Sequence, residues 1–277
     1  MRKDIVVRGH DLPVYDDLAV FGQAMQQRGL HSLAYSPAKS LPKTTDDGDA
    51  VSFGLGAMVR RSLSEYGGEI ATLSCYVNMV DSDTTREAQA NARLANYLQV
   101  APAFGTRIVA TETGGVGSPA ENHQAAPFNT LVKRVRELLT VARSAGTYLA
   151  LEPGISNPLY SLDQVAALIA AVNEAPNLKL IIDPTNLLKT REDDANAILS
   201  AAFDRFADRI VAVHLKDYRW PEGASQRELT VPGQGQGDFK AAFAIADQRQ
   251  PYGFKCLDEL PDGQLDQALA LPWLRAL

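Results

Sequence analysis

The feature that most constrains the fold of this chain is a regular alternation of short apolar runs with longer segments of helical periodicity. Eight of the runs have the length and composition of strands, and most are apolar without interruption, which is typical of strands covered on both faces. The predicted strands are Ile5–Arg8, His31–Tyr35, Ile70–Val77, Arg107–Thr111, Tyr148–Glu152, Lys179–Asp183, Ile210–His214 and Phe254–Glu259.

Amphipathic segments separate these runs, the clearest being Thr84–Phe104, Pro127–Ala145, Leu162–Ala175 and Asp194–Ala207. Ser161 followed three residues later by Gln164 is a helix-start signal, and so is Pro127 in a first turn. Gly105 and Gly146 stand where helices are expected to end before the next strand.

Eight strand–helix units in about 250 residues describe an α/β fold, the (β/α)₈ or TIM barrel. A doubly wound open sheet is the competing fold, but it usually has fewer strands and a glycine-rich first turn. No G-x-G-x-x-G motif follows the first predicted strand. Because no linker, low-complexity tract or repeat divides the chain, we expect residues 1–277 to form a single barrel domain.

Two long loops, Thr113–Ala126 and Tyr218–Gly237, follow predicted strands. In a barrel both belong to the C-terminal face, where active sites are built. Loops of this length in compact domains are usually functional or disordered, and the position of these two favours a functional role.

Composition excludes several classes of partner. The chain has 27 basic and 33 acidic residues, a net charge of −6, so it lacks the basic excess of a nucleic-acid binder. No apolar run reaches the roughly 18 residues that a membrane helix needs, and no signal-peptide core precedes Arg8. Cys75 and Cys256 each lie in an apolar run, which predicts buried free thiols and a cytoplasmic protein.

Metal-binding residue types close four consecutive predicted strands. Glu152, Asp183 and His214 end three of them at intervals of 31 residues, and the fourth strand ends in Asp258 and Glu259. One strand–helix unit per residue places these side chains at one height around the barrel. Charged groups that close apolar strands are costly when buried unpaired, and a shared divalent cation relieves that cost. Oxygen-rich ligation with one imidazole favours Mn²⁺ or Mg²⁺ and also accommodates Zn²⁺ or Co²⁺.

The last strand offers two acids, and side-chain alternation is the basis for choosing between them. Placing Glu259 inside gives an inward row that includes Lys255 and leaves Phe254 and Cys256 to face the helices. We therefore expect Glu259 to be the fourth ligand, with Asp258 as the alternative.

The chain resembles the xylose-isomerase-like barrel superfamily, the sugar phosphate isomerase/epimerase group that also contains the apurinic endonucleases. The matching motifs follow one another in the order of the group across nearly the whole chain. They are Leu73-Ser74-Cys75-Tyr76-Val77-Asn78, Thr111-Glu112-Thr113-Gly114, Glu152-Pro153, Asn177-Leu178, Asp183-Pro184-Thr185-Asn186-Leu187-Leu188, His214-Leu215-Lys216-Asp217, Pro232-Gly233-Gln234-Gly235 and Asp258-Glu259.

The resemblance implies a mechanism. Glutamates on strands five and eight, here Glu152 and Glu259, would hold the metal and exchange protons with adjacent substrate carbons through a cis-enediolate. Asp183 and His214 would be ligands that move no protons. The resemblance also implies a homo-oligomer, since barrels of this group are often dimers or larger.

Asn186 stands where several relatives carry a histidine. With only four histidines and a negative net charge, the chain does not fit the trinuclear zinc site or the DNA partner of the apurinic endonucleases.

Four further residues near predicted strand ends are candidates for binding substrate: His10, Glu112, Asn186 and Lys216. The resulting hypothesis is a divalent-metal-dependent isomerase or epimerase of a small sugar, keto-sugar or polyol. A metal-dependent sugar or inosose dehydratase and a non-catalytic carbohydrate-binding barrel are the alternatives. No nucleotide motif is present, so the expected partner is a small carbohydrate, with neither nucleic acid nor membrane.

Overall fold

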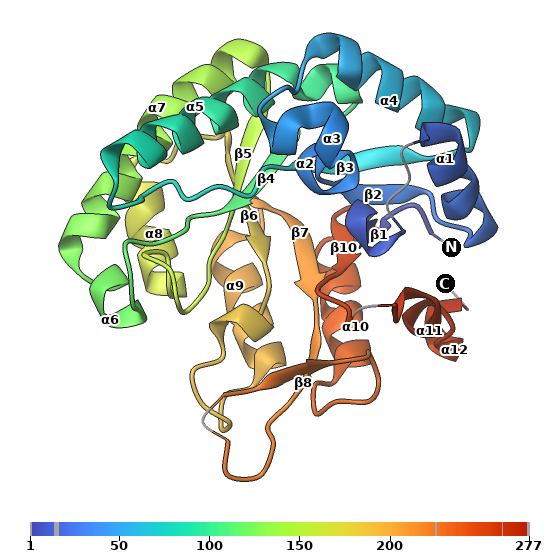
Figure 1. Cartoon of the computed structure of the whole chain (residues 1–277). Helices are drawn as coiled ribbons and strands as arrows, with labels where there is room; N and C mark the ends of the chain where they lie inside the picture. The colour runs from blue at the N-terminus through green and yellow to red at the C-terminus, as the bar shows by residue number, and fades with distance from the viewer. Residues whose placement is uncertain (1, 14–16, 225, 262, 276–277) are drawn as a thin grey trace.

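The computed structural model describes residues 2–13, 17–224, 226–261 and 263–275, and its centre is a closed barrel of eight parallel strands (Figure 1). The order around the barrel is β1-β10-β7-β6-β5-β4-β3-β2. The barrel strands are β1 (Ile5–Arg8), β2 (Ser32–Tyr35), β3 (Glu69–Ser74), β4 (Ile108–Glu112), β5 (Tyr148–Glu152), β6 (Leu178–Ile182), β7 (Ile210–Leu215) and β10 (Phe254–Leu257). Each overlaps one of the eight predicted runs, with ends that differ by up to three residues, so the predicted α/β barrel is confirmed.

Helices follow the strands and cover the outside of the barrel. Their bounds are α1 (Leu18–Gln27), α2 (Pro37–Ser40), α3 (Pro42–Thr45), α4 (Phe53–Glu65), α5 (Thr84–Val100), α6 (Pro119–Asn122), α7 (Ala125–Ala145), α8 (Leu162–Ala171), α9 (Ala195–Phe206), α10 (Phe239–Arg249), α11 (Leu265–Leu269) and α12 (Pro272–Arg275). Within the described residues, no helix is both long and apolar enough to cross a bilayer.

The local signals act as predicted at several helix ends. The hydroxyl of Ser161 accepts a hydrogen bond from the backbone N–H of Gln164 at the start of α8, and Pro127 lies in the first turn of α7. Gly105 and Gly146 both take the left-handed conformation that ends a helical segment.

Two segments predicted as loops contain regular structure. The segment Thr113–Ala126 holds the short helix α6 and the first two residues of α7. The segment after β7 forms an antiparallel hairpin of β8 (Asp217–Arg219) and β9 (Glu228–Thr230). Three-residue strands give almost no periodic signal, so the sequence showed only a long connection there.

The core has two layers. Small and medium side chains fill the barrel interior, and a larger apolar layer separates the strands from the helices. The interior residues are Val6, Ala34, Ala71, Ala110, Ala150, Ile181, Ala212 and Cys256, with Phe254 and Ile108 packed against them. Both cysteines are buried and free, as predicted.

Candidate metal and substrate site

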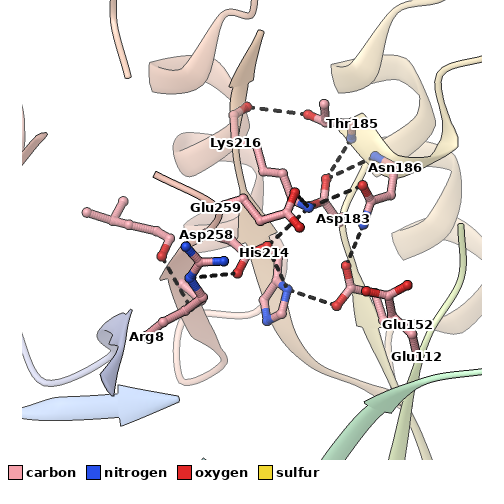
Figure 2. A network of polar contacts seen from close by, with 12 residues as sticks. Arg8, Glu112, Glu152, Asp183, Thr185, Asn186, His214, Lys216, Asp258 and Glu259 are labelled. Atoms are coloured by element: carbon pink, nitrogen blue, oxygen red, sulfur yellow. Dashed lines mark hydrogen bonds and ion pairs between the residues drawn. The ribbon is translucent and has the colours of Figure 1, made fainter. Parts of the chain in front are cut away.

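Four buried side chains from four neighbouring strands converge at the C-terminal mouth of the barrel (Figure 2). Glu152 is the last residue of β5, Asp183 follows β6, His214 lies in β7 and Asp258 follows β10. One donor atom of each lies within 4.8 Å of the donor atoms of the other three.

The alternation of side chains along each strand explains this convergence. Each of the four residues stands two positions after a residue of the barrel interior, namely Ala150, Ile181, Ala212 and Cys256. Side chains two apart on a strand share a face, so the four donors continue the inward rows past the apolar interior into the mouth.

The expectation that Glu259 is the fourth member is wrong, and the alternative Asp258 takes that place. Cys256 faces the barrel interior, where we expected Lys255 from the alternation of side chains along the strand. Lys255 points outward and is almost fully buried, because its ammonium lies 2.8 Å from Asp4 and 3.2 Å from Asp247. These ion pairs join distant parts of the chain and stabilise the lysine outside the barrel interior, which is why the prediction failed.

Glu259 lies at the edge of the cluster. Its side chain is 44% exposed and its backbone is left-handed, with φ of 45°. The Oε2 atom of Glu259 lies 2.5 Å from the ammonium of Lys216.

Lys216 is the cation within the acidic mouth. Its Nζ atom lies 3.2 Å from Asp183 and 3.1 Å from Asp258, and only 3% of the side chain is exposed. Burial favours loss of the proton, but the carboxylates of Asp183 and Asp258 outweigh it and raise the pKa of Lys216. Lys216 therefore stays charged and offsets part of the repulsion among the acids.

Two buried donor atoms of the cluster make no hydrogen bond among the described residues: Asp183 Oδ2, which has only the 3.2 Å ion pair with Lys216, and His214 Nδ1. The His214 atom lies 2.9 Å from Glu152 Oε2 without hydrogen-bond geometry. Burial alone would lower the pKa of His214, but Glu152 and Asp258 raise it to about 9. Three carboxylates and an imidazole gathered in this way fit a divalent cation, which would take the place of the proton on His214.

Asn186 and Lys216, two of the predicted substrate-binding residues, touch this cluster directly. Asn186 Nδ2 donates to Glu152 Oε1 at 2.8 Å, and Lys216 Nζ donates to Asn186 Oδ1 at 3.2 Å. The backbone N–H of Asn186 also donates to Asp183 at 3.2 Å. These contacts tie the amide to two members of the cluster.

Glu112 and His10 lie on either side of the cluster. Glu112 is paired with Glu152 in the register of β4 and β5, and Asn157 donates to its carboxylate at 3.3 Å. His10 follows β1, and both of its ring nitrogens are buried without a hydrogen-bond partner in the described part of the chain. Burial, with the positive charges of Arg8 and Lys39, lowers the pKa of His10 to about 4, so its ring is neutral at pH 7.

Arg8 is a member of the site that the sequence argument missed. Its guanidinium lies 2.6 Å from Asp11 and 3.7 Å from Asp258, so it supports the carboxylate that takes the fourth place. The alternation along β1 contains the signal, because Arg8 stands two residues after the interior residue Val6.

Comparison with known proteins assigns the chain to a family and agrees with the barrel fold. The family model described as xylose isomerase-like TIM barrel matches residues 23–277, and the chain therefore belongs to that family. The inosose dehydratase of Glaesserella parasuis is 26% identical over 163 residues, which are 54% of this chain and 52% of that protein. The chain thus spans about half the length of the curated relatives it matches.

Among solved structures, the 3-keto-D-glucoside 4-epimerase YcjR of E. coli superposes with a TM-score of 0.75 over 100% of both chains, at 17% identity. A xylose isomerase-like TIM barrel protein from Mycobacterium smegmatis, in complex with magnesium, has a TM-score of 0.70 at 20% identity and covers 97% of this chain and 96% of its own. At such low identity these likenesses show the barrel fold.

Proposed function

We propose that this chain is a divalent-metal-dependent enzyme that isomerises or epimerises a small sugar, keto-sugar or polyol through a cis-enediolate. The observation that carries the proposal is the group of four buried donors at the barrel mouth, with Lys216, Asn186 and Glu259 beside it. A fold alone would not support an activity, since barrels host many chemistries.

Glu152, Asp183, His214 and Asp258 would hold the cation, with Mn²⁺ or Mg²⁺ favoured and Zn²⁺ or Co²⁺ compatible. A bound cation would supply Lewis-acid polarisation of a substrate carbonyl. The chain's own contribution is the set of buried charged side chains at the mouth that would position the ligands.

Two carboxylates are the groups that we propose to move protons. Glu152 is the proposed base for the proton alpha to the carbonyl, and Asn186 orients its carboxylate through the 2.8 Å hydrogen bond. Glu259 is the proposed second group, which returns a proton to the neighbouring carbon. Its exposure allows it to reach substrate, and the ion pair to Lys216 fixes its direction.

A dehydratase is the second candidate, and the similarity to inosose dehydratases favours it. Removal of a proton alpha to a carbonyl is the first step in both cases. In a dehydratase a β-hydroxyl then leaves as water instead of a proton returning.

The test uses metal-reconstituted protein and a panel of ketoses, 3-keto-sugars and inososes in D₂O, followed by NMR. Deuterium at carbon with retention of the hydroxyls indicates isomerisation or epimerisation, and loss of water indicates dehydration. Glu152→Gln should lower either rate by about 10²–10⁴-fold while the circular dichroism spectrum is unchanged. Carbohydrate binding that persists in EDTA without any turnover would contradict the proposal and indicate a binding protein.

A further inference from the structure

The hairpin of β8 and β9 extends directly from β7, the strand that carries His214. Three residue pairs join its strands, from Asp217↔Thr230 to Arg219↔Glu228. Arg227 immediately precedes β9, so its position is fixed by this pairing.

Asp217 anchors the base of this hairpin. It is 1% exposed, and its carboxylate accepts four backbone hydrogen bonds, from Tyr218 at 2.8 Å, Gly233 at 2.8 Å, Gly235 at 2.9 Å and Gly237 at 3.1 Å. A carboxylate that accepts several N–H groups is a strong local constraint. The segment that returns from β9 is therefore held against the end of β7.

The far part of the hairpin is held as well. Arg191, in the connection after β6, donates to the carbonyls of Pro221 at 3.3 Å and Ala224 at 2.9 Å. The guanidinium also lies 5.8 Å from the centre of the Trp220 ring. Because both parts of the hairpin are held by these contacts, it has a defined position beside the mouth.

Arg227 is a half-buried charged side chain of this hairpin with no hydrogen bond or ion pair in the described part of the chain. Its Nε atom is buried and makes no hydrogen bond within the described residues. Burial lowers the pKa of Arg227, while the charges of Asp183 and Glu259 act in the opposite direction. Both of those carboxylates already contact Lys216.

A half-buried guanidinium without an acceptor is unfavourable, and an arginine fork matches the geometry of carboxylate and phosphate groups. We infer that Arg227 binds an oxyanion, a carboxylate or a phosphate, carried by the substrate of the site at the barrel mouth. This inference rests on the proposed function and adds that the substrate is a sugar acid or a sugar phosphate.

The test measures binding to metal-loaded protein by titration calorimetry, with D-gluconate, D-glucose 6-phosphate and neutral D-sorbitol as probes. Arg227→Gln is compared with Arg219→Gln, which removes the same charge from the exposed 3.1 Å pair with Glu228 on the same hairpin. We expect Arg227→Gln to lower the affinity for one of the two anions by about tenfold or more, and the affinity for sorbitol by less than about twofold. Arg219→Gln should leave the binding of all three probes unchanged.

The anion whose affinity falls identifies the group that Arg227 binds. A loss for gluconate indicates a carboxylate, and a loss for glucose 6-phosphate indicates a phosphate. Equal binding of both anions by wild type and Arg227→Gln would overturn the inference, as would tightest binding of sorbitol by wild type. The metal content of the same samples distinguishes a failure of the proposed function from a failure of the oxyanion site. A wild-type chain that holds no metal contradicts the proposed function, whereas a metal-loaded chain that binds anions independently of Arg227 contradicts the oxyanion site alone.

Discussion

The ammonium of Lys216 lies 2.5 Å from the carboxylate of Glu259, a residue whose backbone is left-handed, with φ of 45°. For a residue other than glycine this conformation costs about 1–2 kcal/mol, and the ion pair with a buried lysine is a contact that offsets it. The pair holds Glu259 beside the four donor atoms but outside their group.

Lys216→Met should destabilise the metal-free protein by about 3 kcal/mol or more, because it leaves the carboxylates of Asp183 and Asp258 buried without their cation. Urea unfolding in EDTA measures this difference. Saturating divalent metal should restore much of the loss, since the added ion replaces the missing charge. A variant as stable as wild type in EDTA would show that Lys216 does not neutralise the mouth.

Stability of the metal-free protein should fall with rising pH above neutrality. The pKa of His214 is raised from 6.5 to about 9, so its protonated form stabilises the fold fully below pH 6.5. That contribution, on the order of 3 kcal/mol, is lost as the pH rises through about 9. Urea unfolding at pH 6, 7.5 and 9.5 in EDTA tests this. The decline should be smaller in His214→Gln, and a wild-type stability that rises over this range would be evidence against the imidazolium.

Gly235→Ala should loosen the hairpin. A Cβ atom at Gly235 would lie 2.1 Å from Asp217 Oδ1 and 2.4 Å from the Tyr218 carbonyl, so the segment must move. Hydrogen exchange should become faster in residues 228–237 and remain unchanged in the barrel strands. Gly54→Ala on α4 is the matched control, because the nearest atom to its Cβ is 4.0 Å away. Unchanged exchange in Gly235→Ala would mean that the Asp217 contacts do not order this segment.

Both cysteines should be unreactive in the native state. Burial raises the pKa of the Cys75 and Cys256 thiols, which keeps them protonated and out of reach. With a disulfide-exchange reagent at pH 8, we expect two thiols to react in denaturant and almost none without it. Rapid reaction of one thiol in the folded protein would place that residue in a more open environment.

Much of the fold could be predicted because eight strands buried on both faces leave eight apolar runs in the sequence. The equal spacing of Glu152, Asp183 and His214 predicted their convergence, since one strand–helix unit separates each residue from the next. The choice between Asp258 and Glu259 failed because it depended on the direction of Lys255. That direction is set by Asp4 and Asp247, whose proximity only the folded chain shows.

The roles of the hairpin residues could not be predicted from the sequence, for a different reason. β8 and β9 are short, and Asp217 and Arg227 act through backbone contacts and burial that have no periodic signature. Arg8 could have been found, because the alternation along β1 applies to it as it does to Glu152 and His214.

The most direct test of the account is the metal content of Asp258→Asn and Glu259→Gln beside wild type. Untagged protein is stripped with EDTA, reloaded with Mn²⁺, desalted and analysed by plasma mass spectrometry. We predict about one ion per chain in wild type and in Glu259→Gln, and a loss of at least about tenfold in affinity for Asp258→Asn. Retention of metal by Asp258→Asn together with its loss from Glu259→Gln would contradict the assignment, and a wild-type chain that binds no ion would contradict the metal site as a whole.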